Sequence, residues 1–584
     1  MRRSPFVVLC RAFFARFFAS ESATSDEALR QAIVGVLAFI LTPCLLILIN
    51  VFPQFQLLVI RVGRVHPPPG VVVRATAVRN INGDDMLEWA VAILVAYSMV
   101  SIGLVVVWVW DALGFDRRDG MVLGPLPIRW TTIAAAKVTA LAALLLGASA
   151  TVNLLNATMF ALETADRFGA GALVRHFVAC LIVTTAASAL VFATAVTVRA
   201  GVALVGGARL ATLSGAALQF LFVVAALVFF VATFTPPADA GVITLPTLTL
   251  EPPVAWFVAW FEVLRGSDRG AWDEFGMMAR HAQAAVAIAA VAAMAASAAS
   301  VRRQLQAALT PAAAPGPLGR ARISRAIAGL FVGRRPVRRA LSDFVLTTIA
   351  RSRAQQGPIA VNAAIGAAAI VMALARERRD AIWVLLAAPL VLTYWLGVGL
   401  RASFFVPSDL PASWTFGCHA PRAPRAYWAA VRASAIGFLL PFAVAADALL
   451  IPAIGVRAAA LHGLLVLAVT ALVAEGVAAT IDFVPFTRAY RPGHARLKTR
   501  WPLYLLLLAV IGFAPAVAAR RALGDGAAAA ALAAKIAAVA VVVHCVGRVR
   551  ASRWSVDEID ERLDGSDRIA VLDIGFTLPG ASRV

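Results

Sequence analysis

The sequence predicts an all-α polytopic integral membrane protein with about twelve transmembrane helices in two six-helix halves. Of its 584 residues, 61% are hydrophobic and 15% are charged, and the mean hydropathy is +0.82. An ordinary soluble enzyme is excluded, because its apolar share is about a half. Apolar runs of about 20 residues, the length that crosses a bilayer, recur along the chain, and basic residues gather between them.

Twelve such runs can be placed. The first six are 31–52, 87–110, 131–153, 176–198, 211–234 and 281–300. The second six are 358–375, 381–400, 433–454, 458–481, 502–519 and 526–545. A basic amphipathic segment precedes each set, which indicates two fused, repeated halves.

Five segments follow from this layout. They are an interfacial amphipathic helix (1–30), a first six-span half (31–300), a basic cytoplasmic linker with an amphipathic helix (301–357), a second six-span half (358–548) and a cytoplasmic tail (549–584). The linker alone holds eleven arginines.

The distribution of positive charge predicts that both chain termini are cytoplasmic. With the N-terminus inside, the cytoplasmic connections hold 36 of the 53 Lys and Arg residues and the outer connections hold 15. Basic residues are retained on the cytoplasmic side of membrane proteins. We therefore assign the net charge of +21 to contact with membrane lipid, and we predict no nucleic-acid partner.

No cofactor or metal site is predicted. The five cysteines form no C-x-x-C pair and no even framework. The chain has no G-x-x-x-x-G-K-[ST] motif, and its only lysines, Lys137, Lys498 and Lys535, lie outside any glycine loop. A P-loop for ATP is therefore excluded.

One connection differs from a simple turn. The stretch FDRRDGMVLGPLPIRW, Phe115 to Trp130, joins the second and third predicted spans on the cytoplasmic side. Pro125 and Pro127 stiffen the chain, which we expect to push Leu126 and Ile128 outward as a preformed apolar contact ringed by charge. The same residues also suit an ordinary positive-inside turn with a proline-rich start to the next helix.

This loop, continued through DRRDGMVLGPLPIRWTTIAAAKV to Lys137 in the next span, resembles the cytoplasmic loop of the permease subunits of type-2 ATP-binding-cassette (ABC) exporters. Those permeases are also similar in having six spans per half, an interfacial helix before the first span, and short helices in the outer loop between spans five and six. In that family the loop docks on a separate ATPase. The resemblance implies a docking loop made of Asp116, Arg117, Arg118, Leu126, Pro127 and Arg129.

The second half has a corresponding connection between its second and third spans. It is also bracketed by prolines, and its candidate docking residues are Pro407, Asp409, Leu410 and Pro411. The second half departs from the pattern of those permeases in two respects. This connection is longer, and the outer loop between the last two spans is very short.

The outer connection 235–280 contains PPVAWFVAWFEVLRG, which predicts a helix. Trp256, Trp260, Phe261 and Leu264 fall on one side of it, and such an aromatic side suits the headgroup level of the outer leaflet.

Ionisable groups within lipid are rare and often functional. Besides Lys137, the candidates are Asp447, Glu475 and Lys535. They could contact substrate or protons, or they could be structural, for example as a pair between Asp447 and Lys535.

Two other functions stay open. Twelve spans in two halves also suit a proton-coupled secondary transporter, although the stretch GFDRRDG matches the Asp-Arg motif of the major facilitator superfamily only superficially. A polytopic glycosyltransferase that uses a lipid-linked sugar would need paired carboxylates, and Asp84 and Asp85 lie in the first outer loop. These acids equally suit the start of a helix.

The function predicted is a membrane permease, not an enzyme. It moves an unidentified substrate outward across a bacterial plasma (inner) membrane and is driven by a separate ATP-binding subunit. Whether one chain or a homodimer forms the pathway is left open.

Overall fold

The computed structural model describes residues 4–17, 83–115, 117–164, 170–234, 253–308, 320–333, 335–376, 381–408, 424–487, 501–522 and 524–551. The regular structure in these ranges is helical, with no β-strand among them. Ten of the described helices are long and apolar enough to cross a bilayer. The predicted class, an all-α polytopic membrane protein, is confirmed. The first predicted span, 31–52, lies outside the described residues.

The chain divides into two compact units. Unit 1 contains Met1–Gly316 and Ala363–Ala381, and unit 2 contains Pro317–Asn362 and Ile382–Val584. The boundaries predicted from the sequence stay predictions.

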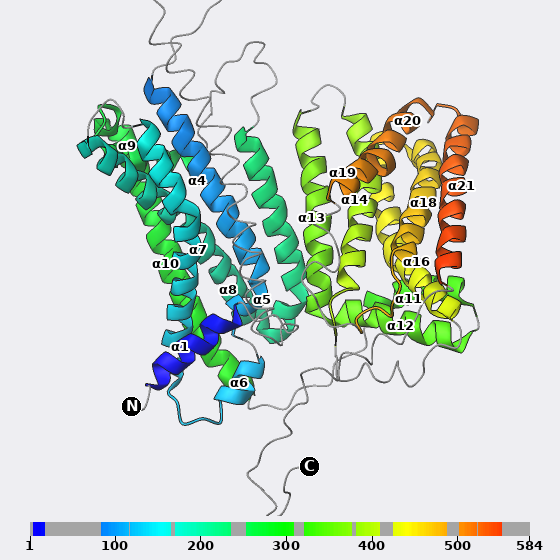
Figure 1. Ribbon diagram of the computed structural model, residues 1–584, viewed down its shortest axis with the longest axis horizontal. Coiled ribbons are helices and arrows are strands. Elements are labelled where there is room, and N and C mark those ends of the chain that lie inside the picture. Colours follow the sequence, from blue (N-terminus) through cyan, green and yellow to red (C-terminus); the bar gives the residue numbers. More distant parts are fainter. Residues whose placement is uncertain are drawn as a thin grey trace, which may run out of the picture. The chain divides into compact units, whose positions relative to one another are not determined.

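Unit 1 is built from long helices joined by short ones (Figure 1). In chain order they are α1 (Pro5–Arg16), α4 (Gly83–Trp108), α5 (Trp110–Leu113), α6 (Arg117–Leu123), α7 (Trp130–Thr164), α8 (Ala170–Phe234), α9 (Val254–Arg265), the 3-10 helix η1 (Arg269–Ala271), α10 (Asp273–Ala308) and the later part, from Ala363, of α13 (Arg353–Arg376).

The longest helix, α8, holds two of the predicted spans. Its 65 residues would extend about 100 Å if the helix were straight. However, a Cβ added at Gly103 of α4 would lie 3.8 Å from Val191 Cγ1 and 3.9 Å from Ala226 Cβ, both in α8. A straight helix would hold those two residues about 50 Å apart. The chain therefore turns back within α8, and its two arms, which match the predictions at 176–198 and 211–234, pack on the same helix.

Neutral hydrogen bonds join three helices at the centre of unit 1. Ser98 of α4 donates to Asn153 Oδ1 of α7 at 2.6 Å, and Asn153 Nδ2 donates to Ser188 of α8 at 3.3 Å. All three side chains are fully buried. Hydrogen bonds of this kind fasten helices inside a membrane, where lipid removes most of the hydrophobic drive for association.

The predicted outer helix is present as α9, but it packs against protein. Phe257 and Phe261 are fully buried, and Trp256 and Trp260 pack against the same apolar core. Of the four residues on the predicted aromatic side, Phe261 is buried, Trp256 and Trp260 are half-buried and Leu264 is 37% exposed, while α4, α8 and α10 pack on the helix. Contact of this side with the outer leaflet stays a prediction. An ion pair of 2.8 Å between Arg269 of η1 and Glu88 of α4 closes this end of the unit.

Unit 2 is also built from long helices together with shorter ones (Figure 1). It contains α11 (Arg320–Val332), α12 (Pro336–Arg351), the start of α13 (Arg353–Arg376), α14 (Ile382–Ser403), α16 (Pro424–Ala448), α17 (Ile451–Ile454), α18 (Val456–Ala479), α19 (Trp501–Leu508), the π-helix η3 (Ala509–Phe513), α20 (Ala514–Ala522) and α21 (Gly526–Arg550).

The helices of the two units pack in the same order. In unit 1 the basic helix α1 packs on α7, and α4, α7 and α10 all pack on α8. In unit 2 the basic helix α12 packs on α16, and α14, α16 and α21 all pack on α18. The two units therefore share the same set of helix contacts, taken in chain order.

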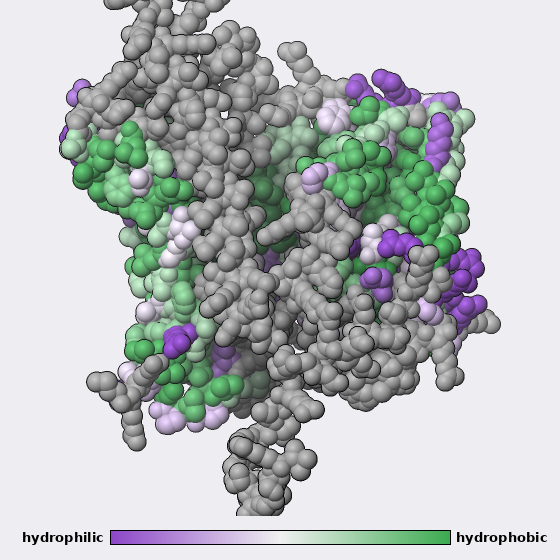
Figure 2. Space-filling model, viewed as in Figure 1, coloured by the Kyte–Doolittle hydropathy of each residue, from purple (hydrophilic) through white to green (hydrophobic). Residues whose placement is uncertain are grey.

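Apolar side chains are exposed along the outer faces of the long helices (Figure 2). On α10 they include Ile288, Val291 and Met294, and on α21 they include Val539, Val541 and Val542. Soluble proteins rarely expose apolar surface of this extent. These faces are suited to contact with lipid.

Gly437 of α16 allows α11 to lie against the membrane-spanning bundle. A Cβ at this position would lie 2.5 Å from the Ser324 carbonyl oxygen and 2.8 Å from Ala328 Cβ, both in α11. We expect Gly437→Ala to destabilise the protein by about 1–3 kcal/mol, the usual effect of overpacking. Thermal unfolding in detergent measures this.

Gly476→Ala in α18 is the matched control. Apart from the nearby backbone of its own helix, no atom lies within 4 Å of an added Cβ there, and alanine favours a helix over glycine by about 0.5–1 kcal/mol. Equal unfolding temperatures for the two variants would contradict the close approach at Gly437.

Candidate docking loop and buried ionisable side chains

The loop predicted to dock an ATPase, between α5 and α7, is partly helical. Arg117–Leu123 form α6, which packs on α10. The α6 helix ends in a tight turn, where Gly124 N donates to the Gly120 carbonyl oxygen at 2.8 Å. A Cβ at Gly124 would lie 2.6 Å from that oxygen, so the turn requires glycine. Asp116 and the side chains of Arg117 and Arg118 lie outside the described part of the structure.

Three apolar side chains form the tip of this loop. Met121 and Val122, at the end of α6, are 51% and 67% exposed, and Leu126 is 45% exposed. Pro127 and Arg129 are exposed beside them. The prediction that Leu126 points outward is confirmed, and we call Met121, Val122 and Leu126 the apolar tip.

Ile128 differs from the prediction. Its side chain is half-buried and packs against the apolar core formed by α1, α5 and α7. The chain bends between the two residues, because Ile128 N donates a hydrogen bond to the Leu126 carbonyl oxygen at 2.7 Å, and this turn lets their side chains point in different directions. Ile128 therefore fixes the loop to the unit, while the neighbouring proline-bracketed residue, Leu126, projects from it.

The base of the loop is held by Lys137, which is only 2% exposed. Its Nζ donates to the Ala112 carbonyl oxygen of α5 at 2.6 Å. This carbonyl lies in the last turn of a helix, where carbonyl groups lack a helical partner and attract a cation. Lys137 thus joins the two helices on either side of the loop.

The same ammonium group lies over two rings, one in α1 and one directly after its end. Lys137 Nζ is 5.3 Å from the ring centroid of Phe13 and 5.1 Å from that of Phe17, both distances typical of cation–π contacts. Cys10 Sγ of α1 lies 3.7 Å from the Ala136 carbonyl oxygen. Burial raises the pKa of the Cys10 thiol, so it stays protonated and can donate this weak bond. One lysine therefore connects α1, α5 and α7.

The second predicted docking loop is described only at its start. Pro407 is present, and its carbonyl oxygen accepts a hydrogen bond from Gln355 Nε2 at 3.2 Å. Gln355 also donates to the Val406 carbonyl oxygen at 3.0 Å. Asp409, Leu410 and Pro411 lie outside the described residues.

Glu475 of α18 is the centre of an ionic cluster that joins three helices. It forms an ion pair with Arg432 of α16, and its two oxygens lie 3.2 Å from His544 Nδ1 of α21. The Glu475 side chain is 5% exposed and that of Arg432 is 27% exposed. The ring of Trp428 contacts that of His544 in a tilted arrangement, with centroids 5.1 Å apart.

Asp447 of α16 has a different partner from the one predicted. His462 Nδ1 of α18 lies 2.6 Å from Asp447 Oδ1, and the histidine is fully buried. Lys535, the partner suggested by the sequence, is exposed on α21. The chain turns back at α17 between Asp447 and His462, so a partner 15 residues away is closer than a lysine on a later span.

The carboxylates considered for an enzyme, Asp84 and Asp85, lie in the first turn of α4, and their side chains are outside the described part. Within the described ranges, no group of three or more His, Cys, Asp and Glu side chains could hold a metal ion.

Sequence reasoning missed two contributors to these sites. The apolar tip includes Met121 and Val122, and the signal for them was their position next to Gly124 at the end of a short apolar run. The role of α1 as an anchor was also missed. Its signal was the spacing of Phe13 and Phe17, which lie four residues apart and thus on one helix face.

Comparison of the chain with protein-family models, with curated proteins and with solved structures finds no match. The resemblance to ABC permeases therefore stays a proposal.

Proposed function

We propose that the chain is the transmembrane permease subunit of an ABC-type exporter in the plasma membrane of a bacterium. A separate ATP-binding subunit drives the movement of its substrate. In this proposal the chain has twelve spans in two six-helix halves, and both termini are cytoplasmic, as the positive charges of its connections suggest.

The observation that carries the proposal is the apolar tip on a fixed base. Met121, Val122 and Leu126 are exposed outside the apolar runs that span the membrane. Contiguous exposed apolar side chains rimmed by polar ones mark protein contacts. The tip is stiffened by prolines and has exposed Arg129 beside it, which suits docking of a soluble partner.

The base of the loop explains how docking could move the spans. Lys137 ties α7 to α5, and Ile128 packs against the core of the same unit. A force on the tip is therefore passed to the second and third predicted spans. The common packing order of the two units supports the two-half repeat that such permeases have.

The test is co-purification of an ATP-binding subunit. The double variant Leu126→Asp, Pro127→Gly places a charge in the contact and loosens its backbone. We expect at least a tenfold loss of ATPase activity that elutes with the tagged protein, because truncating a central apolar contact costs about 2 kcal/mol. Membranes of the native source, solubilised in mild detergent, provide the partner.

Val456→Asp is the matched control, since Val456 is 70% exposed at the start of α18, in unit 2. It should leave the associated ATPase activity unchanged. Equal association for wild type and the Leu126 variant would overturn the docking site, and external labelling of the 115–130 loop in intact cells would overturn the topology.

A proton-coupled secondary transporter is the second candidate. It is favoured by the buried Asp447–His462 pair and the Glu475 cluster, to each of which α18 contributes one residue, His462 or Glu475. His462 and Glu475 are 13 residues apart in α18, which is about 20 Å along a helix. Transport that an uncoupler stops, and that ATP depletion leaves intact, would select this candidate.

A further inference from the structure

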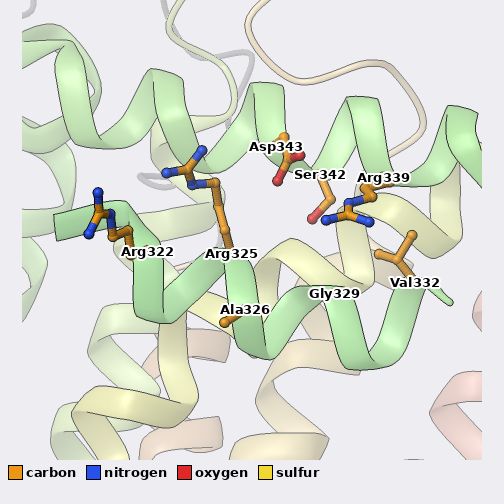
Figure 3. Close-up of a pocket in the computed structure, with 8 residues that line it drawn as sticks. All are labelled: Arg322, Arg325, Ala326, Gly329, Val332, Arg339, Ser342 and Asp343. Carbon is orange, nitrogen blue, oxygen red and sulfur yellow. The ribbon is translucent and has the colours of Figure 1, made fainter. Parts of the chain in front are cut away.

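A basic pocket lies between the two amphipathic helices of unit 2, α11 and α12. Its volume is about 210 Å³. In Figure 3, Arg325 reaches from α11 toward α12, while Ser342 and Asp343 point from α12 toward α11. The lining residues are Arg322, Arg325, Ala326, Gly329, Val332, Arg339, Ser342 and Asp343.

Both walls of the pocket are fixed to the same spanning helix. On one side, α11 lies against Gly437 of α16, where only glycine leaves room for it. On the other, Ser434 of α16 donates a hydrogen bond to Ser342 Oγ of α12 at 3.2 Å, and Ser342 is buried. The pocket is therefore part of the folded unit and not a gap between loose surface helices.

The pocket carries an excess of positive charge. Three guanidinium groups line it against a single carboxylate, that of Asp343. Arg335, directly before α12, and Arg338 in its first turn continue the basic surface. Burial, and then the charge of Arg335, lower the pKa of Arg338, and its Nε is buried without a hydrogen-bond partner. The positive electrostatic potential of these arginines favours the binding of an anion in the pocket.

Phosphate is the anion that arginines recognise best, since the planar fork donates two parallel hydrogen bonds to its oxygens. The volume of the pocket limits which phosphate-containing ligands can fit. Pockets for drug-sized ligands begin at about 300 Å³, so this one suits a phosphate group with its ester atoms better than a whole nucleotide.

Apolar side chains beside the pocket favour a lipid as the source of the phosphate. Ile323, Leu330 and Phe331 of α11 and Val337 of α12 are all largely exposed. A basic, amphipathic helix with such side chains lies at the membrane interface, next to headgroups. Acyl chains could then cover the exposed apolar residues.

We propose that the pocket between α11 and α12 binds the phosphate group of an anionic phospholipid through Arg322, Arg325 and Arg339. The bound lipid fastens the two amphipathic helices to each other and, through Ser342 and Gly437, to α16.

The test measures stabilisation of the full chain in neutral detergent. The thermal unfolding midpoint, followed by tryptophan fluorescence, is recorded with added dioleoyl phosphatidylglycerol, dioleoyl phosphatidylcholine or sodium phosphate. We expect phosphatidylglycerol to raise the midpoint and phosphatidylcholine to leave it unchanged. In the double variant Arg322→Gln, Arg339→Gln the lipid concentration that gives half of the shift should rise at least tenfold, since two charge-assisted hydrogen-bond donors to the phosphate are removed.

The double variant Arg457→Gln, Arg521→Gln is the matched control. It removes the same charge from exposed positions of unit 2 outside the pocket and should behave as wild type. Asp343→Asn removes the carboxylate that repels phosphate and should tighten binding several-fold, which keeps the test decisive if the arginine variant does not fold.

Each possible result of these measurements either supports or overturns the phosphate site. A shift with sodium phosphate at the same concentration as with the lipid would support the phosphate site and assign it to free phosphate. Equal weakening in the pocket and control variants, no stabilisation by either phosphate compound, or unchanged binding in Asp343→Asn would overturn the proposal.

Discussion

Replacement of Glu475 by alanine is expected to lower the free energy of unfolding by about 3 kcal/mol, because it leaves Arg432 without its counter-charge inside the bundle. Glu475 is the only carboxylate that both Arg432 and His544 contact in the hydrogen bonds described, and it joins α16, α18 and α21. Urea unfolding in mixed micelles, or the thermal midpoint, measures the loss.

The double variant Arg432→Met, Glu475→Leu tests the cause. Replacing both members of a buried ion pair by apolar side chains of similar volume is often neutral or stabilising. The double variant should therefore be more stable than Glu475→Ala alone, although it carries two substitutions. If it is less stable, the charge imbalance is not the reason for the loss.

Replacement of Lys137 by alanine is expected to cost about 3 kcal/mol and to release α1. The change leaves the Ala112 carbonyl oxygen without this donor, removes two cation–π contacts and opens a cavity in the core. Hydrogen exchange of the α1 amides should accelerate while that of α21 is unchanged.

Lys535→Ala is the control, since Lys535 is exposed in a spanning helix of unit 2. It should change stability by less than about 0.5 kcal/mol, as surface substitutions usually do. Slow exchange in α1 of the Lys137 variant would show that apolar packing by Leu9, Phe13 and Phe17 holds that helix without the lysine.

The fold class could be predicted because the hydrocarbon core of a membrane imposes one length on every span. Each predicted span within the described residues falls on a helix, including the two arms of α8. That the chain turns back within α8 without leaving helical backbone could not be foreseen. Its connection at 199–210 is short and rich in alanine, valine and glycine, which allows helix where a loop was expected.

Partners across the bundle could not be predicted, because hydropathy does not tell which face of a helix meets which neighbour. Asp447 therefore received the wrong expected partner, Lys535, instead of His462. Local chemistry was more informative. The prolines on both sides of Leu126, which act within a few residues, correctly predicted that its side chain is exposed, but the same argument was wrong for Ile128, which packs against the core.

The burial of Lys137 gives the protein a chemical reporter of its own. The chain has only three lysines, and an acylating ester modifies an amine only when the reagent can reach it. Inside its shell of phenyl rings and a carbonyl oxygen, the Lys137 amine is shielded. The fraction of Lys137 that becomes acylated, measured by mass spectrometry of its peptide, would report the fraction of molecules in which α1 has dissociated from the unit. No introduced probe is needed.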